Sequence, residues 1–146
     1  MKTDTEVLWL GFIIIALVLI LIFLSVPKTE GAENIIAQVI AAEAGGEGYE
    51  GMYAVACVIQ NRMQLFGMTA EEVVTQKNQF FGYTAKNRHA NYLAVKHVAD
   101  ALAERIGTLR DITGGALHFE NIKTFGVPAW AKSKKVLAVV GSHTFF

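Results

Sequence analysis

Glu43 is the carboxylate of this chain whose sequence neighbours best suit acid–base chemistry. It follows Ile36 by seven residues, Val39 by four and Ile40 by three, so a helix would place it on their apolar face. Burial there disfavours the charged form and raises the pKa of a carboxyl above its ordinary value. A carboxyl that keeps its proton near neutral pH can serve as the general acid in glycoside cleavage. The alternative is a structural glutamate that binds backbone or Arg62 at a helix end.

Other kinds of chemistry fit the sequence less well. The four histidines do not show the spacing of a zinc protease motif and no cysteine cluster accompanies them, so we expect no metal and no other cofactor. His143 is expected to be a structural, hydrogen-bonding residue. The single cysteine, Cys57, excludes an internal disulfide and is predicted to be a small core residue. Residues 28–146 hold 12 basic and 11 acidic side chains, so no nucleic-acid partner is expected.

Hydrophobic periodicity predicts a mostly helical α+β domain. We expect helices over 33–44 and 49–64, a short helix from a capping box at Thr69 to Gln76, a loop over 77–88, and a helix over 90–106. Beyond Gly107 the pattern changes, and the segments ALHF (116–119) and VLAVV (136–140) are typical of short strands.

The N-terminal segment has the composition of a membrane anchor. Val7 to Leu24 is an uncharged apolar run of about 27 Å as a helix, close to the thickness of a bilayer core. A cleaved signal peptide is the alternative, but its apolar region would be shorter and followed by a small-residue cleavage site. We therefore predict a transmembrane anchor over 1–26, a linker over 27–32 and one domain over 33–146.

A set of ordered motifs resembles the SleB/CwlJ-like cell wall hydrolase family. The segment AQVIAAEAGGEGYEGMYAVACVIQNRM, residues 37–63, is similar to the family pattern of E-A-x-G-E, Y-E-G, an alanine- and valine-rich helix and N-R. Further similarities follow in the same order at Gln79-Phe80, 113–121, 128–130 and 141–145. The resemblance covers nearly all of residues 33–146.

The resemblance implies a lysozyme-like fold and Glu43 as the catalytic residue. It also implies lytic transglycosylase chemistry at the bond between N-acetylmuramic acid and N-acetylglucosamine. Glu47, the second glutamate of the motif, is expected to orient the turn or the start of the next helix. Sugar sites combine aromatic faces with amide and hydroxyl groups, and the residues that we expect to line the cleft are Gln79, Phe80, Tyr83, Phe119, Asn121 and Trp130.

These expectations describe a peptidoglycan-cleaving enzyme held at the cytoplasmic membrane. Residues 7–26 would span the membrane once, and the catalytic domain would lie on its outer or periplasmic side, where glycan strands are found. The competing hypothesis is a non-enzymatic, membrane-anchored protein that keeps a lysozyme-like shape in order to bind glycan.

Overall fold

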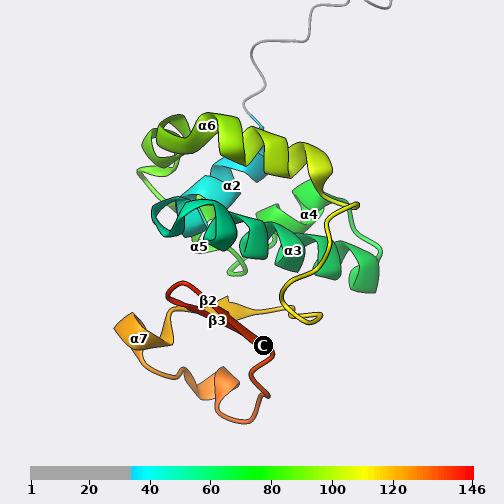
Figure 1. Cartoon of the computed structure of the whole chain (residues 1–146), viewed down its shortest axis with the longest axis vertical. Helices are drawn as coiled ribbons and strands as arrows, with labels where there is room; N and C mark the ends of the chain where they lie inside the picture. The colour runs from blue at the N-terminus through cyan, green and yellow to red at the C-terminus, as the bar shows by residue number, and fades with distance from the viewer. Residues whose placement is uncertain (1–33) are drawn as a thin grey trace, which may run out of the picture. The chain divides into compact units, whose positions relative to one another are not determined.

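The computed structural model describes residues 34–146, which form one compact unit (Figure 1). The predicted anchor, the linker and Glu33 lie outside the described residues. None of the helices between residues 34 and 146 is long and apolar enough to cross a membrane.

Five helices form the larger part of the unit. They are α2 (Ile35–Ala44), α3 (Gly48–Phe66), α4 (Ala70–Thr75), α5 (Phe81–Thr84) and α6 (Arg88–Arg105), with a 3₁₀ turn, η1 (Gly45–Glu47), between α2 and α3. Helix α2 packs against both α3 and α6. The mostly helical composition with a small sheet confirms the predicted fold class at this coarse level, and the lysozyme-like shape stays a prediction.

Local sequence signals explain three of the helix ends. The Asn34 side chain accepts hydrogen bonds from the backbone N–H groups of Ile36 and Ala37 and so caps the start of α2. The capping box predicted at the start of α4 is confirmed, because the side chains of Thr69 and Glu72 bind each other's backbone N–H groups. Helix α3 ends at Gly67, which adopts the left-handed conformation that glycine tolerates best.

The predicted loop over 77–88 was wrong in one respect, because it contains the one-turn helix α5. A single turn is too short to show a hydrophobic period, so no pattern could have revealed it. Helix α6 also departs from the prediction. It begins two residues earlier, and Val95 interrupts it with φ −130° and ψ 20°.

A three-stranded antiparallel sheet and two short helical segments make up the C-terminal part. The strands β1 (Phe119–Glu120), β2 (Ala138–Val140) and β3 (His143–Phe145) are arranged in the order β1-β3-β2. The first two confirm the predicted extended segments, whereas the central strand β3 was not predicted. Helix α7 (Ile122–Phe125) and the 3₁₀ turn η2 (Ala129–Ala131) connect β1 to β2 and were not predicted either.

Helix α3 is the centre of the core. One of its faces packs with α2 and α4 through Val55 and Ile59, and another contacts the sheet, where Ala54 and Val58 meet Phe145. Cys57 is fully buried in this helix, which confirms its predicted place in the core. The sheet is therefore fixed to the helices by apolar contacts of α3, and the two parts together can hold a site between them.

Candidate active site

Glu43 lies in the last turn of α2 and its carboxyl points toward the first turn of α5. The backbone N–H of Gly82 donates a hydrogen bond of 2.5 Å to its Oε1 atom. The side chain is half-buried. The sequence also allowed a structural glutamate that binds backbone or Arg62. The structure shows the bond to backbone, but Arg62 is not a partner of Glu43, because its guanidinium binds Gln76 and the carbonyl of Leu117.

Burial raises the pKa of Glu43 above its ordinary value. The hydrogen bond from Gly82 favours the ionised form and opposes this effect, whereas the negative charge of Glu120 adds to it. Burial is the largest of the three causes, so the net direction is upward. A carboxyl in these surroundings retains its proton to a higher pH than an exposed glutamate, as a general acid requires.

Glycine is needed at position 82 because α5 approaches α2 very closely. A Cβ atom there would lie 2.9 Å from Cβ of Ala42 and 3.1 Å from Cγ of Glu43. Real Cβ atoms almost never come as close as the first of these distances. Gly82 therefore allows the short contact through which its N–H reaches the Glu43 carboxyl.

Glu47, four residues after Glu43, is a second carboxylate near the end of α2, and its environment lowers its pKa instead of raising it. The backbone N–H of Ser142 donates to Oε2 at 2.9 Å, and the Ser142 hydroxyl donates to Oε1. These two bonds are the main reason that the pKa of Glu47 is lowered. Glu47 directly precedes α3 but makes no side-chain capping bond there. It fixes the β2–β3 turn instead, which differs from the role expected from sequence.

Two glycines make room for this contact. A Cβ at Gly141 would lie 2.2 Å from Oε2 of Glu47, and a Cβ at Gly51 would lie 2.3 Å from Cβ of Glu47. Glu43 and Glu47 both line a cavity of about 350 Å³ beside η1 and α6. The same cavity is thus lined by Glu43, whose pKa is raised, and by Glu47, whose pKa is lowered. Pairs of carboxyl groups with opposite pKa shifts are found at acid–base sites.

We expect the Glu47–Ser142 contact to stabilise the fold in a pH-dependent way. Because the pKa of Glu47 is lower in the folded state, its contribution is present above the ordinary value of 4.5 and is lost as the pH falls through the folded value. Glu47→Gln should therefore lower the free energy of unfolding at pH 7, by at most about 1 kcal/mol for a group that water partly screens, and the melting temperature should fall with it. The difference from wild type should shrink in acid. Glu50→Gln, at an exposed position in the first turn of α3, is the control; an equal effect of both substitutions at pH 7 would contradict this role.

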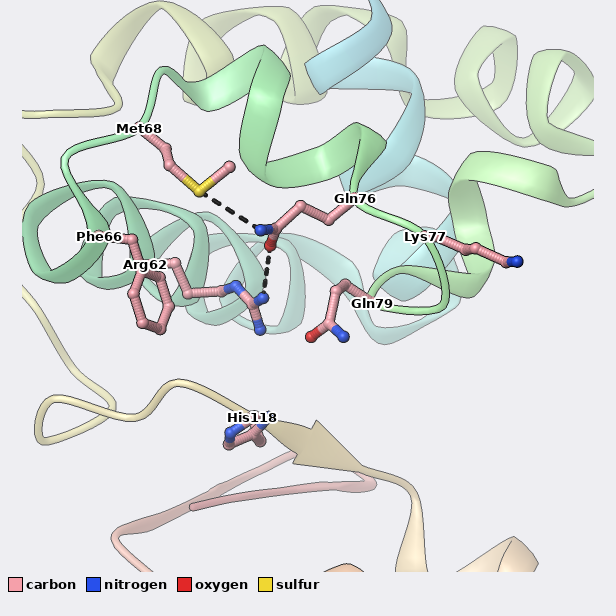
Figure 2. A pocket seen from close by; sticks show the side chains of 7 residues that line it. All are labelled: Arg62, Phe66, Met68, Gln76, Lys77, Gln79 and His118. Carbon is pink, nitrogen blue, oxygen red and sulfur yellow. Dashed lines mark hydrogen bonds between the residues drawn. The ribbon is translucent and has the colours of Figure 1, made fainter.

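The residues predicted to bind sugar in the α4–α5 region differ in accessibility. Gln79 is exposed and lines a second cavity, which also contains Arg62 (Figure 2). Phe80 is only 4% exposed and belongs to the core, so its ring has no free face for a sugar. Tyr83 is half-buried, and the Arg88 guanidinium lies over its ring at 5.5 Å.

The predicted residues of the C-terminal part are also separated by their environments. Phe119 packs against the rings of Phe80 and Phe145, at centroid distances of 6.2 and 5.7 Å. Asn121 caps α7 through Oδ1, and its Nδ2 donates to the Ser142 hydroxyl, so it supports the Glu47 contact. Trp130 is 42% exposed, so among the aromatic residues predicted for the cleft it keeps the most accessible ring.

Sequence reasoning missed Gly82, Ser142 and Glu120 as neighbours of the two carboxylates. The Gly-Ser-His motif near the C-terminus contains Ser142, but nothing in it indicates a contact with residue 47. His143 is buried, and its Nδ1 atom has no hydrogen-bond partner. Its ring packs edge-on against Phe119, and the hydrogen bonding expected for it is not made at Nδ1. Among residues 34–146 no cluster of three or more metal-binding side chains is found.

A half-buried glutamate with a raised pKa, beside a cavity in a small helical domain, is the kind of site that glycosidases use. The family model for Cell Wall Hydrolase matches residues 46–146. The chain therefore belongs to the cell wall hydrolase family, which confirms the resemblance drawn from the motifs. The match includes Glu47 and begins three residues after Glu43. No curated protein and no solved structure gave a significant match to the chain.

Proposed function

We propose that the chain is a peptidoglycan glycosidase that works as a lytic transglycosylase, with Glu43 as its single acid–base group. The observation that supports this proposal most directly is the position of the Glu43 carboxyl, which is half-buried beside a cavity and accepts a hydrogen bond from the N–H of Gly82. Because this N–H occupies Oε1, the proton to be transferred is carried by Oε2. Membership of the cell wall hydrolase family supports peptidoglycan as the substrate.

The proposed reaction uses Glu43 twice. Its proton passes to the glycosidic oxygen between N-acetylmuramic acid and N-acetylglucosamine as the bond to the anomeric carbon breaks. The resulting carboxylate then accepts the proton of the muramic C6 hydroxyl, whose oxygen bonds to the anomeric carbon and closes a 1,6-anhydro ring. Glu43 is reprotonated and no water is consumed. The N–H of Gly82 stabilises the carboxylate between the two steps.

The hydrogen bonds of Glu47 favour this single-carboxylate scheme. Both oxygens of Glu47 accept hydrogen bonds from Ser142, which makes this group a poor base for water. Glu120 raises the pKa of Glu43 through its charge, and its Oε1 accepts the N–H of Asn121 at 3.0 Å. A hydrolase that uses water would need a second carboxylate at a set distance from the acid, and Glu120 is the residue that could supply it.

We further propose that residues 7–26 hold the enzyme in the cytoplasmic membrane with its domain on the outer side. The apolar run and the location of the substrate support this topology. The linker over 27–32 is short, so cleavage would be confined to glycan near the membrane surface.

Digestion of purified peptidoglycan by the membrane fraction of expressing cells tests both parts of the proposal. We expect the activity to sediment with membranes and to be released by detergent. The soluble fragments should end in anhydro-muramic acid, one water lighter in mass than the hydrolysis product. Reducing, water-terminated ends would contradict the transglycosylase scheme and favour a two-carboxylate hydrolase. Activity that stays in the soluble fraction without detergent would contradict the anchor.

A further inference from the structure

A second cavity, of about 490 Å³, lies between the helices and the segment that leads into β1 (Figure 2). We call it the Arg62 pocket. Arg62 comes from the C-terminal half of α3, Gln76 and Gln79 from the segment between α4 and α5, and His118 from the residue before β1. Figure 2 shows the Arg62 and Gln79 side chains directed toward the space above His118.

Arg62 is a buried cation without an acidic partner in the described part of the chain. Its side chain is 6% exposed, and its guanidinium donates to Oε1 of Gln76 at 2.7 Å and to the carbonyl of Leu117 at 3.2 Å. The Nε atom is buried and makes no hydrogen bond. Buried arginines are usually paired with a carboxylate, because removing the charge from water is costly unless an anion compensates it.

The other polar groups of the pocket also suit an anion. Lys77, an exposed positive residue, also lines it, and the amide group of Gln79 can donate hydrogen bonds. No aspartate or glutamate is among the residues that line it. A guanidinium presents N–H groups in a planar fork that matches the two oxygens of a carboxylate. The pocket therefore suits an anion, and among the charged groups of peptidoglycan the fitting one is a carboxylate.

Two segments connect the Arg62 pocket with the catalytic glutamate. Gln79 lines the pocket, and Gly82, three residues later, holds Glu43. On the opposite side His118 lines the pocket, and Glu120, two residues later, acts on Glu43 through its charge. The pocket and Glu43 are therefore linked along the chain by two short segments, of three and two residues.

We propose that the Arg62 pocket binds a carboxylate of the peptide stem that muramic acid carries in peptidoglycan. This inference rests on the proposed function, because it takes the substrate from there. It adds a determinant of specificity: the enzyme would recognise stem-bearing glycan by the charge of the peptide as well as by the sugars. Arg62 supplies the buried charge, and Lys77, which also lines the pocket, supplies an exposed one.

Equilibrium binding tests the proposal independently of cleavage. The full chain in detergent is titrated by calorimetry with a disaccharide–tetrapeptide from peptidoglycan, which lacks the bond between muramic acid and the next glucosamine and is not cut. The same ligand with its stem carboxyls converted to methylamides should bind at least about tenfold more weakly. Peptide-free disaccharide, whose lactyl carboxylate is free, should bind as weakly as the methylamide.

Two substitutions assign the effect to the pocket. Lys77→Gln should weaken binding of the acidic ligand several-fold and leave the methylamide unaffected, and Arg62→Lys should have a larger effect in the same direction. Lys86→Gln makes the same charge change at an exposed position outside the pocket and should bind as wild type does. Circular dichroism checks that Arg62→Lys is folded. If this variant is unfolded, Lys77→Gln, at an exposed position, tests the proposal by itself.

Several results would overturn the proposal. Equal binding of the acid and the methylamide, no binding of either, or an unchanged affinity of Lys77→Gln would each do so. Full affinity for the peptide-free disaccharide would assign the pocket to the lactyl carboxylate instead of the stem. If the protein binds the stem carboxylate as expected but cuts no peptidoglycan, the proposed function fails and the pocket assignment stands.

Discussion

Glu43→Gln is expected to reduce the cleavage of peptidoglycan by about a thousandfold, within the range of about 10²–10⁴ that a general acid contributes. Glutamine has the same shape, and its carbonyl oxygen can accept the N–H of Gly82 that now binds Oε1. It cannot deliver a proton to the glycosidic oxygen or accept one from the C6 hydroxyl. The rate at which soluble fragments are released from purified peptidoglycan measures the effect.

The stability of this variant separates loss of chemistry from loss of fold. The pKa of Glu43 is higher in the folded protein than in the unfolded chain. Once the pH exceeds the ordinary value of 4.5, Glu43 therefore ionises more readily in the unfolded chain, which lowers the free energy of unfolding. The substitution removes that cost, so the variant should melt at the wild-type temperature or above it at neutral pH. Glu50→Gln is the matched control and should keep wild-type activity. If Glu43→Gln remains fully active, the enzyme does not use this residue. If the wild-type protein is itself inactive, the non-enzymatic glycan-binding hypothesis is favoured.

Gly82→Ala is expected to lower activity by about 10- to 100-fold although residue 82 has no side-chain chemistry. The added methyl group would lie 2.9 Å from Cβ of Ala42 and 3.0 Å from the carbonyl oxygen of Val39, so α5 must move away from α2. That movement lengthens the hydrogen bond between the Gly82 N–H and Glu43. Displacements of about 1 Å at a catalytic group are sufficient for losses of this size.

Thr84→Ala, in the same short helix at an exposed position, is the control for Gly82→Ala. It should leave the rate near that of wild type. The two variants are compared in initial rates of fragment release, with melting temperatures measured alongside. Wild-type activity of Gly82→Ala would show that the contact between α5 and Glu43 has no part in catalysis.

The helical part of the fold was largely predictable because its signals are local. The stripe of Ile36, Val39 and Ile40 placed Glu43 on the inner face of its helix, and the capping box at Thr69 marked the start of α4. Helix α5 has a single turn and no period, so nothing in the sequence indicated it. The central strand β3 was missed for a similar reason, since three residues are too few to show an alternating pattern.

The site was less predictable, because its contacts join distant segments. Ser142 binds Glu47 across 95 residues of chain, and Gly82 binds Glu43 across 39. Residue type alone also could not separate exposed aromatic rings from buried ones. Phe80 was expected in the cleft but belongs to the core, whereas Trp130 keeps an accessible surface. Which ring faces solvent depends on how the sheet packs on α3, and a sequence pattern does not contain this information.

The most direct test of the account is a pH titration of the Glu43 carboxyl by carbon-13 nuclear magnetic resonance. The signal is assigned by its disappearance in Glu43→Gln. A midpoint above the ordinary value of 4.5 is predicted, because burial and the charge of Glu120 both favour the protonated form. A midpoint at or below 4.5 would contradict the account, since the residue would then have no proton to give at the pH where a cell wall enzyme works.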